Sequence, residues 1–170
     1  MTPIRVEGSR RSDLISRAGA DKVSVEHEPQ HRPGRYLAVQ IDHKYYAFPN
    51  ECVREVMPVQ DLFPPLLAPQ TLAELGLIGF LHTQSARVPV FDLARRLEGQ
   101  VREIRLTTQT RMIVIEAHGI RVGFYADRLT DMIQARAHEI RKDTIIGHGR
   151  PKLILSLDQL WTQQELAELA

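Results

Sequence analysis

The sequence predicts a mainly β protein, and two hairpins carry most of this prediction. The first hairpin joins residues 36–41 to residues 44–48, and the second joins residues 112–117 to residues 120–126. Aromatic and β-branched residues on these arms suit a pleated, half-buried surface. Short strands separated by glycine or proline favour small barrels over a parallel sheet with alternating helices. Because each hairpin opens one half of the folded region, we expect two similar small barrels.

Turn residues set the boundaries of both hairpins. Asp42 and His43 are the expected turn of the first hairpin. His118 and Gly119 join the second pair of strands, and a two-residue turn that ends in glycine suits the positive φ of a tight hairpin.

Prolines and glycines punctuate the rest of the chain. Residues 87–93 predict a strand whose internal Pro89 places it at a sheet edge or a bulge, because proline has no N–H for a ladder. The prolines between residues 58 and 69 exclude a long helix there. Residues 75–81 predict a turn and then a buried strand, since a helix would lose about 1 kcal/mol at each of its glycines. Residues 153–157 predict the last strand.

Helices are predicted only in short pieces. A helical turn is expected over residues 50–54, and a second over residues 94–97, ended by Gly99. Thr162 and Glu165 have the spacing of a capping box, which predicts a helix at the C-terminal end.

Composition excludes several classes of protein. The 170 residues carry 22 Lys plus Arg against 21 Asp plus Glu, and this balance argues against a nucleic-acid reader. The single cysteine, Cys52, excludes an internal disulfide framework and a cysteine-cluster metal site. No apolar run approaches the roughly 20 residues of a membrane span, and the first residues lack the apolar run of a signal peptide. We therefore expect a soluble, cytoplasmic protein that does not insert into a membrane.

The chain divides into a tail and a folded domain. Residues 1–34 mix charges of both signs without a lasting apolar period, so they bury too little to offset their ordering entropy. We expect a flexible tail there, with a short docking helix over residues 12–17 as the alternative. Residues 35–170 form the expected folded domain.

Residues that could carry chemistry form no recognisable site. The histidines show no metal-ligand spacing, and Cys52 lacks the motif context of a nucleophile. Asp92 and Asp127 each follow an apolar strand, and we interpret them as acceptors for backbone N–H groups rather than as an acid–base pair. The sequence therefore predicts no catalytic residue, no metal and no cofactor.

A nucleic-acid-binding small β-barrel is the alternative function. Such a barrel needs exposed aromatic residues among basic ones. Tyr45, Tyr46 and Phe48 lie close to Lys44, but core packing is the better explanation of these aromatic residues.

Several segments, taken in order, resemble the CheW-like adaptor domain of bacterial chemosensory systems. Residues 53–56 (Val-Arg-Glu-Val) are similar to the Val-x-Glu-hydrophobic element of that family. Gly79 and residues 88–93 resemble its glycine and its Pro-Val-hydrophobic-Asp-Leu run. Residues 122–129 look like its Val-Gly-hydrophobic-hydrophobic-Val-Asp element, and residues 153–160 resemble its closing strand and helix. The resemblance covers residues 35–161.

This resemblance implies a fold and a function. The fold is two SH3-like five-stranded β-barrels packed on each other, with short helices and a C-terminal helix. The function is that of a non-catalytic scaffold that couples chemoreceptors, at their cytoplasmic tips, to a CheA-type histidine kinase. The kinase carries a homologous domain, and other CheW-like domains are expected as further partners. The protein would be recruited from the cytoplasm to membrane-associated receptor arrays.

The chain departs from the family pattern in one loop. The family usually has Asn-Leu-Arg-Gly where this chain has His82, Thr83, Gln84 and Ser85. Gln84 cannot replace the bidentate, charge-assisted bond of an arginine. We therefore expect a specialised adaptor, for example one governing surface motility or a second-messenger output.

The expected interface combines this loop with the Val-x-Glu element. Its residues are Val53, Glu55, His82, Thr83, Gln84 and Ser85. For Val53 a core position, and for Glu55 a solvated charge, are equally good interpretations of the sequence.

Overall fold

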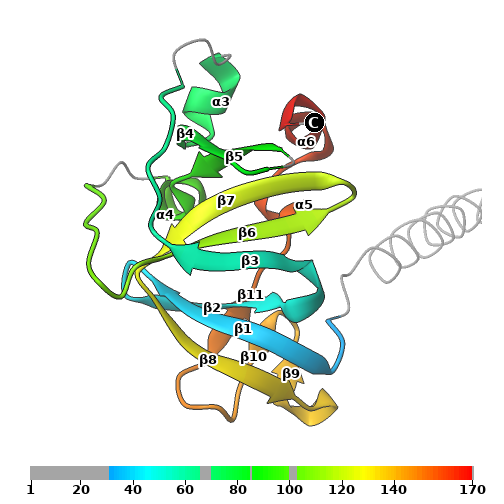
Figure 1. Cartoon of the computed structure of the whole chain (residues 1–170). Coiled ribbons are helices and arrows are strands. Elements are labelled where there is room, and N and C mark those ends of the chain that lie inside the picture. The colour runs from blue at the N-terminus through cyan, green and yellow to red at the C-terminus, as the bar shows by residue number, and fades with distance from the viewer. Residues whose placement is uncertain (1–30, 66–69, 85, 100–102, 170) are drawn as a thin grey trace, which may run out of the picture. The chain divides into compact units, whose positions relative to one another are not determined.

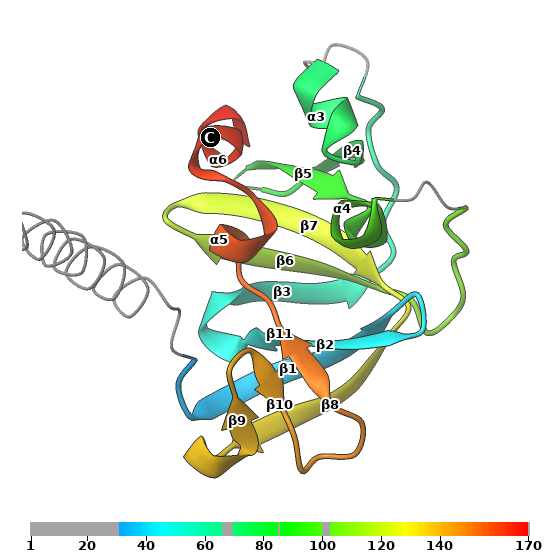
Figure 2. The same ribbon diagram turned by 180° about the vertical axis from the view of Figure 1, so that it is seen from behind.

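The chain is mainly β, as predicted, and its strands form two sheets (Figures 1 and 2). The computed structural model describes residues 31–65, 70–84, 86–99 and 103–169. The predicted tail therefore lies, up to residue 30, outside the described residues. No helix in these ranges is both long and apolar enough to cross a membrane.

The first sheet has six strands in the order β8-β1-β2-β11-β10-β9, and the second has five in the order β3-β6-β7-β5-β4. The strands of the first sheet are β1 (Gly34–Ile41), β2 (Lys44–Pro49), β8 (Arg128–Ala135), β9 (Ile140–Arg141), β10 (Thr144–Ile145) and β11 (Lys152–Ile154). The strands of the second sheet are β3 (Val53–Pro58), β4 (Leu77–His82), β5 (Arg87–Phe91), β6 (Arg111–Ala117) and β7 (Ile120–Ala126). The helices are η2 (Asn50–Cys52), α3 (Gln70–Glu74), α4 (Leu93–Glu98), η3 (Ala137–Glu139), α5 (Leu157–Leu160) and α6 (Gln163–Leu169).

The two sheets are built on one plan and exchange a strand. In each sheet an antiparallel hairpin, β1–β2 or β6–β7, pairs in parallel with a later strand, β11 or β5. The outer neighbour of each hairpin is the strand that follows the other hairpin, so that β8 pairs with β1 and β3 pairs with β6. The prediction of two similar halves is confirmed, and they are built as sheets of six and five strands. The exchange was not predicted, because strand pairing between halves leaves no local signal.

Both hairpin turns have the predicted conformation. Asp42 and His43 have φ values of 50° and 68°, and His118 and Gly119 have 55° and 77°. Positive φ at both central residues matches the right-handed twist of the flanking strands.

One local prediction was wrong, and two elements that were predicted correctly end earlier than expected. The strand β5 lies inside its sheet rather than at an edge, because its ladder with β7 begins at Val90, one residue after Pro89. The helical turn expected over residues 50–54 ends at Cys52, where β3 begins its pairing with β6. The last strand, β11, ends at Ile154 instead of residue 157, and α5 follows.

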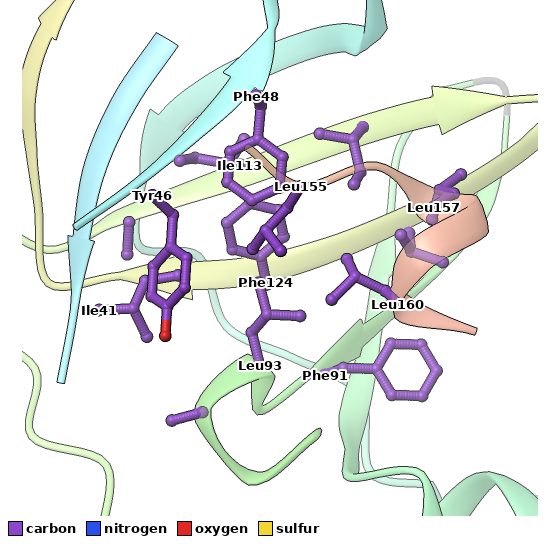
Figure 3. Packing of buried hydrophobic residues seen from close by; sticks show 14 of the residues in the cluster. Ile41, Tyr46, Phe48, Phe91, Leu93, Ile113, Phe124, Leu155, Leu157 and Leu160 are labelled. Atoms are coloured by element: carbon purple, nitrogen blue, oxygen red, sulfur yellow. The ribbon is translucent and has the colours of Figure 1, made fainter. Parts of the chain in front are cut away.

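A shared apolar core joins the two sheets. Side chains alternate along the hairpins, so one face of each sheet turns toward this central core and the other face packs on a smaller core of its own. Phe48 from β2 and Phe124 from β7 meet at the centre, with ring centroids 4.9 Å apart (Figure 3). Both rings are fully buried. The core therefore holds the first sheet on the second.

The C-terminal helix closes the fold as predicted. The backbone N–H of Thr162 donates to Glu165 Oε2 at 2.7 Å, and the N–H of Glu165 donates to Thr162 Oγ1 at 3.2 Å. This reciprocal pair is the predicted capping box. Arg96 of α4 also bonds the Glu165 carboxylate, at 2.7 Å, and so ties α6 to the second sheet's short helix.

Candidate protein-interaction surfaces

The strand β3 forms a free edge of the second sheet and carries both predicted residues of the Val-x-Glu element. Val53 pairs with Ile115 and Glu55 with Val114, so Arg54 is the extra residue of a β-bulge. Directly paired residues share a face, and Ile115 and Val114 lie on opposite faces of β6. The bulge therefore sends Val53 and Glu55 to opposite faces. Val53 is half-buried against the central core, whereas Glu55 is exposed.

An ion network fixes this bulge. Glu116 of β6 accepts hydrogen bonds from Arg54 Nη2, at 3.0 Å, and from Arg121 Nε of β7. The bond from Arg121, followed by the charge of Arg54, holds the pKa of Glu116 below its ordinary value. The side chain of Arg54, the bulge residue, is thus bonded to the neighbouring strand β6. This bond stabilises the conformation of the bulge.

Glu55 and Val56 are both exposed on this strand, and we call these two residues the β3 edge. Val56 is 41% exposed although it pairs with the buried Ile113. Glu55 has no ion pair within the described part of the chain. The β3 edge therefore offers a solvated carboxylate on one face of the strand and an exposed apolar side chain on the other.

The strand β8 forms the corresponding free edge of the first sheet. Leu129 and Met132 are 36% and 42% exposed. They pair with Val39 and Leu37, which belong to the central core, so both side chains lie at the rim of that core. We call Leu129 and Met132 the β8 rim. Large apolar side chains that gather at a free strand edge are typical of association surfaces.

The loop that departs from the family pattern follows β4. His82 and Gln84 are exposed, and Ser85 lies outside the described residues. The turn is closed by Thr83, whose backbone N–H donates to the carbonyl of Ala86 at 2.8 Å and whose Oγ1 accepts the N–H of Ala86 at 3.0 Å. Thr83 thus shapes the loop, while His82 and Gln84 face solvent.

A residue that the sequence analysis missed covers the edge of β4. Phe63 forms a two-bond backbone bridge with Phe80, with N···O distances of 2.8 and 2.9 Å. A Cβ on Gly79 would lie 2.9 Å from both Leu62 Cβ and the Phe63 carbonyl oxygen, so the glycine permits this close approach. The Phe63 ring is 53% exposed and stacks on His82, with centroids 4.0 Å apart.

Arg87 extends this aromatic group. It pairs directly with His82 across the β4–β5 hairpin, and its guanidinium lies 3.7 Å from the centroid of the Phe80 ring. Within the described residues Arg87 has no ion pair. A stacked guanidinium keeps its in-plane N–H donors for another acceptor. We call Phe63, His82 and Arg87 the β4 patch.

The structure does not bring the predicted interface residues into one site. Glu55 lies on β3 and His82 on β4, the two edge strands of the second sheet, with three strands between them. The apolar residues Phe63, Leu129 and Met132 are the only sequence signal for the β4 patch and the β8 rim. They show no periodic spacing, so the sequence does not indicate that they are exposed.

The residues considered for chemistry are placed in structural roles. Asp127 Oδ2 accepts the backbone N–H of Asp42 at 2.8 Å, as interpreted from the sequence. Burial raises the pKa of the half-buried Cys52 thiol, which is the opposite of what activates a nucleophile. The described residues hold no group of His, Cys, Asp or Glu suited to a metal ion.

The aromatic residues considered for nucleic-acid binding are largely buried. Tyr46 and Phe48 are 5% and 0% exposed, so these two cannot form a stacking platform for bases.

Comparisons with known proteins agree with the fold. A family model described as CheW-like domain matches residues 35–165. The crystal structure of the scaffolding protein TtCheW from Thermoanaerobacter tengcongensis is similar, with a TM-score of 0.62 and 17% identity over 76% of this chain and 93% of that chain. At this identity the structural likeness concerns the fold. No curated protein matches the chain.

The ion network predicts a pH dependence that Glu116→Gln removes. Because folding lowers the pKa of Glu116, its carboxylate stabilises the fold above its ordinary pKa of 4.5, and this contribution is lost as the pH falls through the folded-state value. Urea unfolding from pH 3 to pH 7 should show wild type more stable than Glu116→Gln at neutral pH, with the two converging in acid. A difference that stays constant across this range would contradict the role of the network.

Proposed function

Because the chain belongs to the family of CheW-like domains, we propose that it is a non-catalytic scaffold adaptor in bacterial chemosensory signalling. It couples chemoreceptors, at their cytoplasmic tips, to a CheA-type histidine kinase. The family match extends over residues 35–165, nearly the whole of the described part, so the proposal concerns the domain as a unit. The adaptor works in the cytoplasm at membrane-associated receptor arrays, where other CheW-like domains are further partners.

The distribution of exposed groups supports this function. Both faces of the central hairpins are buried, so contact surfaces fall on the edge strands. The β8 rim and the β4 patch belong to different sheets. An adaptor must hold two partners at once, and two separated surfaces allow this. We assign the apolar β8 rim to the receptor tip and the β4–β5 loop to the homologous domain of the kinase. We assign the β3 edge, at the opposite edge of the second sheet, to a further CheW-like domain.

The altered loop supports a specialised pathway. Gln84 is exposed and carries no charge where the family usually has an arginine. A partner that supplies a carboxylate to that arginine would lose a charge-assisted bond here. The adaptor therefore selects its own kinase and receptor, and surface motility or a second-messenger output is the kind of pathway we propose.

Met132→Asp tests the assignment of the β8 rim. A carboxylate at this exposed apolar position should weaken binding of the receptor cytoplasmic tip about tenfold or more, because losing a hot-spot contact costs about 2 kcal/mol or more. Binding of the kinase domain should not change. Calorimetric titration of the full chain with each purified partner from the same organism measures both.

Gln164→Asp is the matched control, since Gln164 is exposed on α6. Equal effects of Met132→Asp on both partners would contradict separate surfaces. A wild-type chain that binds neither partner at high micromolar concentration would contradict the adaptor function itself.

Gln84→Arg tests the specialised loop. Restoring the family arginine should raise the affinity for kinase domains and receptor tips of ordinary chemotaxis pathways, by the worth of one charge-assisted bond, about 1.5–3 kcal/mol. Gln164→Arg adds the same charge elsewhere and should not change these affinities. If Gln84→Arg binds both sets of partners as wild type does, the loop does not determine partner choice.

A further inference from the structure

Two arginines line the same hollow beside the β8 rim. The hollow has a volume of about 180 Å³, and its lining residues are Gln109, Arg111, Arg128 and Leu129. Arg111 is the first residue of β6 and Arg128 the first residue of β8, which the chain enters directly from β7 (Figures 1 and 2). Leu129 belongs to the β8 rim, so the hollow is continuous with the surface that we assign to the receptor tip.

Both guanidinium groups are held in place by hydrogen bonds. Nη1 of Arg111 donates to the carbonyls of Thr108 and Thr110, both at 2.9 Å. Nε of Arg128 donates to Oε1 of Gln40, its direct partner on β1, at 2.7 Å. A side chain that is already ordered loses less entropy when it binds a partner.

The turn before β6 supports the position of Arg111. The backbone N–H of Thr107 donates to Oγ1 of Thr110 at 2.9 Å, and the N–H of Thr110 donates to the carbonyl of Thr107 at 3.2 Å. The carbonyls that accept from Arg111 therefore belong to an ordered turn.

The charges of these two arginines are available to a partner. Within the described residues neither of them forms an ion pair, in contrast to Arg96 and Arg121. The acidic residues on either side of Arg128 in the chain, Asp127 and Asp131, accept backbone N–H groups instead. Because a guanidinium carries five N–H donors, each of the two groups keeps donors for another acceptor.

Acidic side chains limit the hollow on its other side. A larger hollow of about 480 Å³ shares Gln109 and Arg128 with the smaller one, and its lining includes Asp42, Glu103 and Asp127. The described residues that line the smaller hollow include two arginines and no acid. An anion is therefore favoured in the smaller hollow, next to the apolar rim, and not in the larger one.

We propose that Arg111 and Arg128 bind a carboxylate side chain of the receptor tip, while apolar side chains of that tip cover the β8 rim. This inference rests on the proposed adaptor function and names the chemistry that selects its receptor. Guanidinium and carboxylate groups form charge-assisted bonds of defined geometry, so an acidic residue at the matching position favours one receptor over another. A receptor without this residue leaves the two arginines desolvated and unpaired, which lowers its affinity.

Charge removal provides the test. Calorimetric titration of the full chain with the receptor cytoplasmic tip should show that Arg111→Gln and Arg128→Gln each weaken binding about tenfold or more, the size of a lost charge-assisted bond. Arg141→Gln removes an exposed arginine on β9 and should bind the tip like wild type. Binding of the kinase domain should not change in any of these variants, which also shows that each of them is folded.

Salt and the receptor's own charges distinguish this contact from apolar packing. The wild-type affinity for the tip should fall as salt rises, and the double variant Arg111→Gln/Arg128→Gln should lose most of this dependence. Acidic residues of the tip are then changed to their amides one at a time. One of these changes should be non-additive with Arg111→Gln in a double-mutant cycle.

Two results would overturn this inference alone. They are arginine variants that bind the tip as wild type does, or losses that add to those of every acidic residue of the tip. A wild-type chain that binds no receptor tip would overturn the adaptor function and this inference with it, so the two failures are distinguishable.

Discussion

The contact on which the rest of the structure depends is the packing of the two sheets on a common apolar core. Phe48 and Phe124 lie at its centre and come from different sheets. Burying a phenylalanine side chain contributes about 1.5–3 kcal/mol relative to leaving it in water. Because this core takes one face of each hairpin and the smaller cores take the other, the centres of both sheets are closed to partners.

This constraint directs recognition to the sheet edges. The exposed residues of the β3 edge and the β8 rim, and His82 of the β4 patch, lie on edge strands. The other two residues of the β4 patch, Phe63 and Arg87, lie next to the edge strand β4. The exchange of β3 and β8 between the halves also means that each edge is anchored on the hairpin of the other half. The surfaces are therefore held at fixed positions on one framework, which suits the proposed role of an adaptor with two partners.

Local sequence signals predicted the local features. Both hairpin turns and the capping box at Thr162 were visible because each depends on residues a few positions apart. Pro89 was misleading because the ladder between β5 and β7 begins only at Val90. The missing N–H of Pro89 therefore removes no hydrogen bond from that ladder, and β5 can lie inside the sheet. The strand β3 and its bulge at Arg54 depend on pairing with β6, about sixty residues away in the chain, which no local pattern records.

The candidate surfaces were predictable only in part. The resemblance pointed to Glu55 and to the loop at Gln84, and both are exposed. It could not show that the bulge separates Val53 from Glu55, nor that Phe63 comes back to stack on His82, since both depend on tertiary contacts. The exposed Phe63 lies in a proline-rich segment without apolar periodicity. In such a segment the sequence does not predict which side chains are buried and which are exposed.

The proposed adaptor holds a receptor and a kinase at the same time through separate surfaces. Sedimentation velocity of the full chain mixed with the receptor cytoplasmic tip and the CheW-like domain of the kinase tests it most directly. We expect a complex that contains all three components and is larger than either pairwise complex. Pairwise complexes that displace each other, so that no species contains all three, would contradict it.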